Sequence, residues 1–339
     1  MKHLLYIDIT QVCGLGCGFC MYADKHTSAA IHFRLSDISR KNLIQLINSP
    51  DVKNISISGE GEPLNNIETF FEILSLSNGE RNFEFITSGF IKSDKLERFY
   101  DKLQSKLHPK DKCNIRLSSD SHHVAAIKNK NHGFSINYFE TQRPRNLTLS
   151  FRSIDCDKLF TQLYLMEEAE KYNFSCEMKR ISILEDELYI NNNKYKIDYK
   201  NLVYPKPEDM NYLSLKDYVI AIENKTNKPF TFGSLNKAPI ETGIDLTIKP
   251  NGDVFLYGME VSNLGNLHFD EFNWDIIASL IKKNKVFSFL YEHRLLDVLE
   301  KNKDDNQINQ IIKQVNNPYW LIKEIHRKTG NLEEFLYRD

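Results

Sequence analysis

Three cysteines within eight residues constrain this chain more than any other feature of its 339 residues. Cys13, Cys17 and Cys20 are separated by three and then two residues, with an aromatic residue before the last cysteine. Closely spaced thiolates suit a soft metal centre, and such thiolates hold iron–sulfur clusters. Because a cubane cluster has four irons, three cysteines leave one iron open to a reacting ligand. The triplet therefore predicts a loop that wraps a cluster with one open coordination site.

The residues between the cysteines support a loop. Gly14, Gly16 and Gly18 alternate along this stretch, and glycine permits positive φ and close backbone approach. Phe19 is placed to shield one face of a cluster from water. A helix with cysteines at i, i+4 and i+7 is an alternative, but three glycines make it costly. A zinc site is another, although zinc usually takes four ligands in two pairs and no second pair follows nearby.

Composition limits the classes of partner. The formal net charge is −2 and 41% of the residues are hydrophobic, so nothing points to a nucleic-acid or anionic-membrane surface. No apolar run is long enough to span a bilayer, and the first nine residues alternate too much for a signal peptide. We therefore expect a cytoplasmic protein, in which thiols stay reduced.

The other three cysteines are isolated in the sequence. Cys113, Cys156 and Cys176 each lie in or beside an apolar segment, where a free cysteine behaves as a small buried hydrophobe. No cysteine follows Cys176. A second cluster in the C-terminal half is therefore not expected.

Apolar strands alternate with helical patterns in the first half of the chain. Such alternation predicts βαβ units and a parallel sheet, here an α/β partial (β/α)6 barrel. Ligands bind at the C-terminal ends of the strands in such folds. The stretch 125–142 is ambiguous. The expected strands are 4–9, 52–58, 83–87, 114–118, 147–151 and 176–183, and the expected helices are 36–47, 65–77, 92–107 and 157–172.

The pattern changes after residue 183. Residues 187–199 predict a hairpin around an Asn-Asn-Asn turn, and a second hairpin is expected where 242–254 includes the turn Pro250-Asn251-Gly252-Asp253. Further helices are expected at 213–223, 274–283, 286–299, 307–315 and 319–327. We expect three parts: a core barrel at 1–183, a connecting segment at 184–240, and a hairpin with C-terminal helices at 241–339.

The second expected strand ends in the sequence Gly59-Glu60-Gly61-Glu62-Pro63. A carboxylate and backbone carbonyls at a strand end accept hydrogen bonds from a ligand amine, and Gly61 allows close backbone approach. We assign the amine contact to Glu62, and expect Glu60 to be solvated or beside the substrate. A plain helix entry at Pro63 is the alternative.

Polar residues also follow the fourth and fifth expected strands. Alternation turns Ser118 to the face opposite Leu117. Asp120, His122 and His123 are candidates for substrate binding or proton transfer, or else form a helix cap with exposed histidines. Arg152 suits a bidentate contact with a carboxylate, or a plain ion pair.

The cysteine triplet resembles the signature of the radical SAM superfamily at every spacing. The resemblance implies one [4Fe-4S] cluster held by Cys13, Cys17 and Cys20, whose open iron is chelated by S-adenosylmethionine. In that family, reductive cleavage of the sulfonium yields a 5′-deoxyadenosyl radical that abstracts a hydrogen from the substrate.

Other positions follow from the same resemblance. Gly61, Glu62 and Pro63 are similar to the family's G-E-P motif, which binds the amino group of S-adenosylmethionine. Ser118 corresponds to a serine that contacts its carboxylate or ribose, and the bidentate contact considered for Arg152 would be with the same carboxylate. Tyr22, just after the third cysteine, is implied to stack on adenine, with core packing as the equal alternative. Ser88 stands where the family often has asparagine.

A shorter resemblance lies in the C-terminal half. Residues 246–254 and 264–267 look like the SPASM module of peptide-modifying radical SAM enzymes, in which several cysteines hold auxiliary clusters. Every one of those cysteines is absent here. We therefore expect a SPASM-like segment without a cluster, with an ordinary hairpin as the alternative.

Three functions remain open at this point. The first is radical modification of a peptide or protein, as in ribosomally made peptide products. The second is the same chemistry on a small metabolite such as a sugar, nucleoside or amino acid, and the third is a non-catalytic iron–sulfur protein. An external one-electron reductant of flavodoxin or ferredoxin type is expected. Because the chain starts with the first strand, we expect either a separate leader-peptide-binding protein or the C-terminal helices to hold a peptide substrate.

Overall fold

The computed structural model describes residues 3–206, 211–233 and 243–337. The chain forms two compact units whose segments interleave along the sequence. The first unit consists of Met1–Tyr6, Leu35–Lys53 and Asn201–Asp339, and the second of Ile7–Arg34 and Asn54–Lys200. The predicted limit at residues 240–241 lies outside the described residues.

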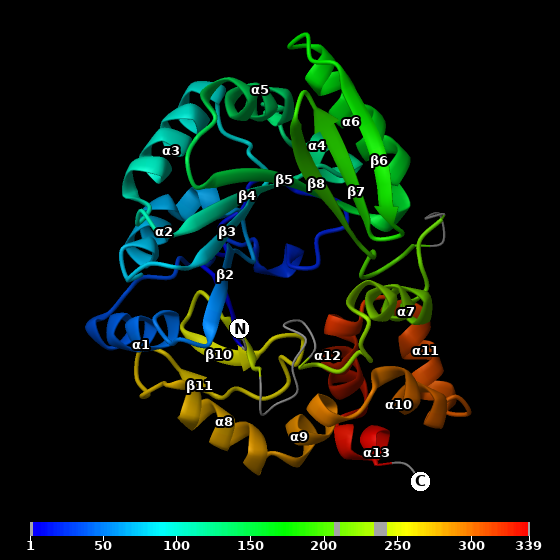
Figure 1. The fold of residues 1–339 in the computed structure, drawn as a ribbon. Coiled ribbons are helices and arrows are strands. Elements are labelled where there is room, and N and C mark those ends of the chain that lie inside the picture. The colour runs from blue at the N-terminus through cyan, green and yellow to red at the C-terminus, as the bar shows by residue number, and fades with distance from the viewer. Residues whose placement is uncertain (1–2, 207–210, 234–242, 338–339) are drawn as a thin grey trace. The chain divides into compact units, whose positions relative to one another are not determined.

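The second unit is built on a parallel sheet. Strands β2, β3, β4, β5 and β8 are hydrogen-bonded in this order, and each neighbouring pair is parallel. Figure 1 shows helices α2, α3, α5 and α6 along the outer side of these strands. The predicted α/β class is confirmed. The bounds are β1 His3–Asp8, β2 Val52–Ser58, β3 Asn82–Thr87, β4 Lys112–Ser118, β5 Leu147–Ile154, β6 Cys176–Ser182, β7 Glu185–Ile190, β8 Asn193–Lys200, α2 Ile67–Leu74, α3 Ser93–Lys106, α4 Ser121–Ala126, α5 His132–Gln142 and α6 Lys158–Glu170.

The strand predicted at 176–183 does not extend the parallel sheet. It forms β6, which pairs antiparallel with β7, and β7 pairs antiparallel with β8. The partner of β5 is β8, the second strand of the predicted hairpin. The sequence hairpin was therefore identified correctly, but its role was not. Periodicity marks a strand without naming its neighbour.

Helices and strands of this unit are joined by aromatic packing. The ring of Phe85 on β3 lies 4.4 Å from that of Phe70 on α2 and 5.1 Å from that of Phe99 on α3. All three side chains are almost completely buried. Ring pairs at such distances stabilise a core beyond the burial of their area. The ambiguous stretch 125–142 contains the end of α4 and all of α5, separated by a short loop.

The first unit begins its helical part with α1 (Asp37–Ile47), and the expected cap at Ser36 is confirmed. Its hydroxyl accepts from the backbone N–H of Ser39 at 3.1 Å, while the hydroxyl of Ser39 bonds the N–H of Ser36 at 2.8 Å. Buried Asn42 on the same helix donates to the carbonyls of Leu267 and Asp270 at 2.9 and 2.8 Å. One amide thus ties together segments more than two hundred residues apart.

The predicted turn at 250–253 joins two antiparallel strands, β9 (Asp245–Ile248) and β10 (Asp253–Leu256). Gly252 has φ +89°, which explains why glycine occupies this position. Strand β11 (Gly265–Asn266) pairs with β10 on the other side. The hairpin is therefore confirmed as a structural element.

The remaining helices of the first unit follow the predicted order, with one correction. The single helix expected at 286–299 is two helices, with a break at His293 and Arg294. Arg294, which lies in this break, forms an ion pair with Glu223 at 2.6 Å. Helix α13 was not predicted. The bounds are α7 Leu215–Thr226, α8 Trp274–Lys283, α9 Lys285–Glu292, α10 Leu295–Lys301, α11 Asn306–Gln314, α12 Pro318–Thr329 and α13 Leu332–Leu336.

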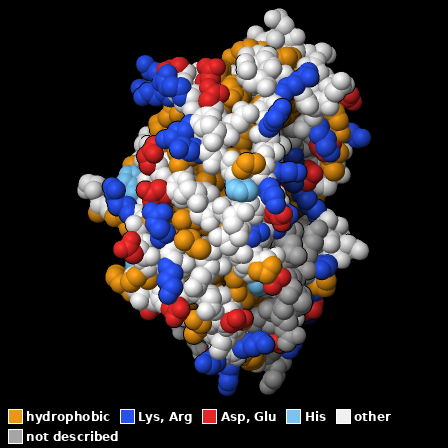
Figure 2. Space-filling model, turned by 60° about the vertical axis from the view of Figure 1, so that its left-hand side comes forward, with side chains coloured by type: hydrophobic (Ala, Val, Ile, Leu, Met, Phe, Trp, Pro, Cys, Tyr) orange, Lys and Arg blue, Asp and Glu red, His pale blue; other side chains and the backbone are white. Residues whose placement is uncertain are grey.

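Across residues 3–206, 211–233 and 243–337, none of the helices has both the length and the apolar character that crossing a bilayer requires. On the face shown in Figure 2, acidic and basic side chains lie among one another.

Candidate cluster and cofactor site

The cysteine loop rests on the loop that follows β2. The backbone N–H of Gly61 donates to the carbonyl of Thr10 at 2.8 Å, and that of Glu62 donates to Val12 at 3.0 Å. The side chain of Gln11 adds a bond from its amide to the Glu60 carboxylate at 2.8 Å. The two loops singled out by the sequence therefore form one hydrogen-bonded platform after β1 and β2.

Gly61 is required by this contact between the loops. A Cβ at this position would lie 2.4 Å from the carbonyl oxygen of Val12 and 2.6 Å from the carbonyl carbon of Gln11. Real Cβ atoms do not approach backbone so closely. The close approach expected of Gly61 is thus an approach to the cysteine loop. Pro63 starts a short 3₁₀ helix, as the helix-entry alternative predicted.

The three cysteines of the loop are free and partly buried. Burial raises the pKa of each thiol, and for Cys17 the nearby Asp120 carboxylate and the thiols of Cys13 and Cys20 help to raise it to about 12. Thiolates so close together repel one another when no metal compensates their charge. A positively charged iron centre would remove that penalty, so the donor set suits a cluster.

The arrangement of the loop, whose residues are all described, provides no preformed site for a single metal ion. Among the described residues, no three His, Cys, Asp or Glu side chains converge on one point where a single metal ion would bind. In a cubane cluster each cysteine binds a different iron, so the three sulfurs need not converge. That Cys13, Cys17 and Cys20 would hold such a cluster remains a prediction.

Glu62 lies at the base of the site with its carboxylate fully engaged. One oxygen accepts from the N–H of Leu64 at 3.1 Å and from the hydroxyl of Thr87 at 2.5 Å. The other accepts from the N–H and the hydroxyl of Ser88 at 2.8 and 2.6 Å. Glu62 thus fastens the loop after β2 to the end of β3. These four donors already take up the lone pairs of the Glu62 carboxylate. The contact of Glu62 with the cofactor amine remains a prediction.

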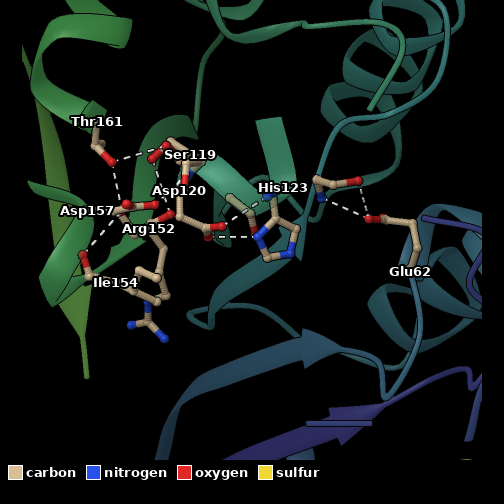
Figure 3. A network of polar contacts seen from close by, with 12 residues as sticks. Glu62, Ser119, Asp120, His123, Arg152, Ile154, Asp157 and Thr161 are labelled. Carbon is tan, nitrogen blue, oxygen red and sulfur yellow. Dashed lines mark hydrogen bonds and ion pairs between the residues drawn. The ribbon is translucent and has the colours of Figure 1, made fainter. Parts of the chain in front are cut away.

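The residues after β4 surround the aromatic ring of the cysteine loop. Phe19 lies 4.7 Å from the ring of His122 and 5.3 Å from that of His123. The Nδ1 of His123 lies 2.7 Å from Asp120, as Figure 3 shows. Asp120 also caps α4 by accepting from the backbone N–H of His123 at 3.0 Å. Burial opposes ionisation of Asp120, but His123 outweighs it and lowers the pKa of this carboxyl. Asp120 and His123 therefore form a helix cap and are also close enough to share a proton beside the cysteine loop.

Ser118, at the end of β4, is positioned by His132, a residue that no sequence pattern singled out. The Nε2 of His132 donates to the carbonyl of Ser118 at 3.0 Å, and its Nδ1 accepts from the hydroxyl of Tyr164 at 2.9 Å. Burial lowers the pKa of His132 to about 4, so its ring is neutral at pH 7. The Ser118 side chain shares a face of β4 with Arg116, as alternation predicted.

Arg152 forms an ion pair, which was the alternative expectation for this residue, and Tyr22 lies close after the cysteine loop. The Arg152 guanidinium on β5 lies 3.5 Å from Asp198 on β8, and Figure 3 shows it pointing away from Asp157 and Thr161. Tyr22 precedes the 3₁₀ turn Ala23–Lys25 directly after Cys20 and is partly buried. Contacts of both residues with a cofactor remain predictions.

The inner face of the sheet carries charged residues that sequence reasoning missed. Arg116 on β4 lies 2.9 Å from Glu84 on β3. Burial opposes ionisation of Asp198, but Arg152 and other cations outweigh it and lower its pKa to about 2. Burial and the nearby Arg152 lower the pKa of Lys200, at the end of β8, to about 8. Polar residues at every second position of these strands were the signal that could have found them.

Comparison with known proteins gives a result for the fold alone. No family model matches the sequence, and the comparison with curated proteins finds no match either. Native anSMEcpe with bound AdoMet and Kp18Cys peptide aligns with a TM-score of 0.51 at 14% identity, over 97% of both chains. Native anSMEcpe with bound AdoMet aligns with a TM-score of 0.50 at 14% identity, again over 97% of both chains. This chain has the fold of anSMEcpe.

A cavity of about 380 Å³ opens beside the cysteine loop. Leu15 of that loop and Phe90, after β3, contribute to its wall. Three cations, Lys92, Lys95 and Lys128, line it as well. A cavity of this size takes a small organic ligand. The cavity thus offers room for a ligand beside Leu15 of the cysteine loop.

Proposed function

We propose that this chain is a radical SAM enzyme that modifies a peptide or protein. The observation that carries the proposal is the platform on which the cysteine loop is fastened to the Gly61-Glu62-Pro63 loop through Thr10 and Val12. A cysteine triplet alone fits several iron–sulfur proteins, whereas its attachment to a second polar loop at strand ends is what a cofactor-binding centre requires.

The chemistry divides between the cofactors and the chain. A [4Fe-4S] cluster with S-adenosylmethionine supplies one-electron reductive cleavage and a 5′-deoxyadenosyl radical that abstracts a substrate hydrogen. Cys13, Cys17 and Cys20 hold the cluster, Gly61, Glu62 and Pro63 with Tyr22 line the cofactor, and Ser118 and Arg152 face its polar groups. We further propose that Phe19, whose ring lies 4.7 Å from that of His122, keeps water away from the cysteines.

Asp120 and His123 take the role of proton transfer. They lie 2.7 Å apart at the end of β4, directly beside Phe19 of the cysteine loop. The lowered pKa of Asp120 keeps its carboxylate charged at neutral pH, which holds the Nδ1 proton of His123 and leaves Nε2 able to accept one. His122, whose ring lies 4.7 Å from that of Phe19, is proposed to contact the substrate.

A peptide is the preferred substrate class for two reasons. The structure of anSMEcpe with similar fold holds AdoMet together with a peptide. In addition, the hairpin β9–β10 with β11 lies in the segment that resembles the SPASM module. We propose a single cluster, because no cysteine follows Cys176 in this sequence. We also propose an external one-electron reductant of flavodoxin or ferredoxin type and a separate protein that binds a leader peptide.

The proposal is tested by anaerobic reconstitution with iron and sulfide, followed by dithionite and S-adenosylmethionine. We expect release of 5′-deoxyadenosine, and a loss of at least about a hundredfold in the Cys17→Ala variant. Cys156→Ala is the matched control, because this partly buried cysteine lies outside the loop and its variant should retain full release. Equal release from Cys17→Ala and wild type would contradict the proposal. Transfer of deuterium from a labelled peptide to the released nucleoside separates a peptide substrate from a small metabolite.

A further inference from the structure

Two guanidinium groups of the second unit have carboxylate partners. Arg116 lies 2.9 Å from Glu84, and Arg152 lies 3.5 Å from Asp198. The ammonium group of Lys200 differs from these two guanidinium groups. Among the described residues it forms no ion pair or hydrogen bond, although Asp120 and Cys20 attract it from a greater distance.

The position of Lys200 is set by strand register. On the paired strands β5 and β8, Arg152 is level with Asp198, and Ile154 is level with Lys200. Lys200 therefore lies two residues beyond the Arg152 level, about 6 to 7 Å nearer the C-terminal edge of the sheet. Substrates enter this class of fold from that edge.

The direction of the Lys200 side chain is fixed by its contact with the cysteine loop. Its Nζ lies 5.9 Å from the ring centroid of Phe19, which lies 4.7 Å from the ring of His122 and 5.3 Å from that of His123. A cation near an aromatic face is held there by the ring quadrupole. The ammonium group thus points to the inner side of the sheet, beside the Asp120–His123 pair.

We propose that Lys200 binds a carboxylate of the substrate at the C-terminal edge of the second unit. A partly buried ammonium without a carboxylate partner is stabilised by an anionic ligand. This inference rests on the proposed function, in which Ser118 and Arg152, at one level of the paired strands, contact the cofactor. A group bound at Lys200 lies beyond that level, which suits an acidic side chain or the C-terminal carboxylate of a peptide.

The test uses acetate as the carboxylate probe on cluster-loaded protein with saturating S-adenosylmethionine. With the carboxylate of the cofactor already bound, an effect of acetate reports a second site. The midpoint temperature of unfolding is compared in acetate and in chloride at equal ionic strength, because a ligand that binds only the folded state raises it. The variants are Lys200→Met and Lys200→Gln, which remove the charge, and Lys200→Arg, which keeps it.

Lys194→Met is the matched control, since Lys194 lies on the same strand but is exposed and forms an ion pair with Glu187. We expect acetate to raise the midpoint in wild type, Lys200→Arg and Lys194→Met, and to have no effect in the two neutral Lys200 variants. The affinity for S-adenosylmethionine, measured by equilibrium dialysis, should change less than about twofold.

Two results would overturn the inference. If acetate stabilises the neutral Lys200 variants as much as wild type, Lys200 binds no carboxylate. If the neutral variants bind S-adenosylmethionine about tenfold or more weakly, Lys200 belongs to the cofactor and not to the substrate. Wild type that binds no S-adenosylmethionine at all contradicts the proposed function instead, and the acetate comparison without the cofactor then still decides whether Lys200 binds a carboxylate.

Discussion

At the scale of single residues, His132 makes a sharp prediction about pH. Its ring is buried between Ser118 and Tyr164, and burial lowers its pKa to about 4 from an ordinary value near 6.5. The unfolded chain therefore binds more protons than the folded chain between these two values. Stability from this residue is fully present above about pH 6.5 and is lost as the pH falls to about 4, by up to about 3 kcal/mol.

The measurement is the free energy of urea unfolding at several pH values for wild type and His132→Gln. The variant is expected to be less stable at pH 7, because buried partners lose a hydrogen bond, but to lose less stability on acidification. An equally steep acid dependence in both proteins would show that His132 does not titrate in this way.

Individual site residues differ in how far the sequence could predict them. The spacing of Cys13, Cys17 and Cys20 along the chain is itself the signal, so these site residues could be predicted without knowledge of the fold. Glu62 was recognisable as part of a motif, but its partners Thr87 and Ser88 lie about 25 residues away and are set by strand pairing. Lys200 was overlooked because a lysine at the end of a polar hairpin has nothing in the sequence to separate it from a solvated one.

At the scale of elements, the contact between the cysteine loop and the loop after β2 can be tested with one methyl group. In Gly61→Ala the new Cβ would meet the carbonyl of Val12 at 2.4 Å, so the backbone of one loop must move. We expect a loss of about 2–3 kcal/mol in unfolding free energy and a lower iron content after reconstitution. Gly14→Ala is the matched control, because nothing lies within 4 Å of its Cβ and its φ is not positive.

Iron per chain and urea unfolding are measured for both variants. Gly14→Ala should stay within about 1 kcal/mol of wild type. Unchanged iron binding and stability in Gly61→Ala would mean that the two loops are not fastened as the structure has them.

The elements also show which part of the fold was predictable. Strands β2 to β5 and their helices follow from periodicity because each strand pairs with the next strand along the chain. The strand order fails where β6 and β7 are inserted and β8 returns to pair with β5. Whether β5 pairs with β6 or with β8 depends on how whole faces of the sheet pack, and a local sequence pattern carries no information on that packing.

At the scale of the whole molecule, the chain groups by contact into two units that alternate along the sequence. The division by sequence at residues 183 and 240 remains a prediction. All the residues assigned here to the cluster, the cofactor and proton transfer lie in the second unit. The fold agrees with that of anSMEcpe over 97% of the chain although only 14% of the residues are identical. Function must therefore be argued from the site and not from the fold.

The central claim is that the cysteine loop holds one cluster whose open iron meets S-adenosylmethionine. Electron paramagnetic resonance of the dithionite-reduced, reconstituted protein, recorded with and without S-adenosylmethionine, tests it most directly. We predict the signal of one reduced [4Fe-4S] cluster per chain, a changed line shape when S-adenosylmethionine is added, and no such signal in Cys13→Ala, Cys17→Ala or Cys20→Ala. A spectrum that S-adenosylmethionine leaves unaltered, or a cluster that persists in these variants, would contradict the claim.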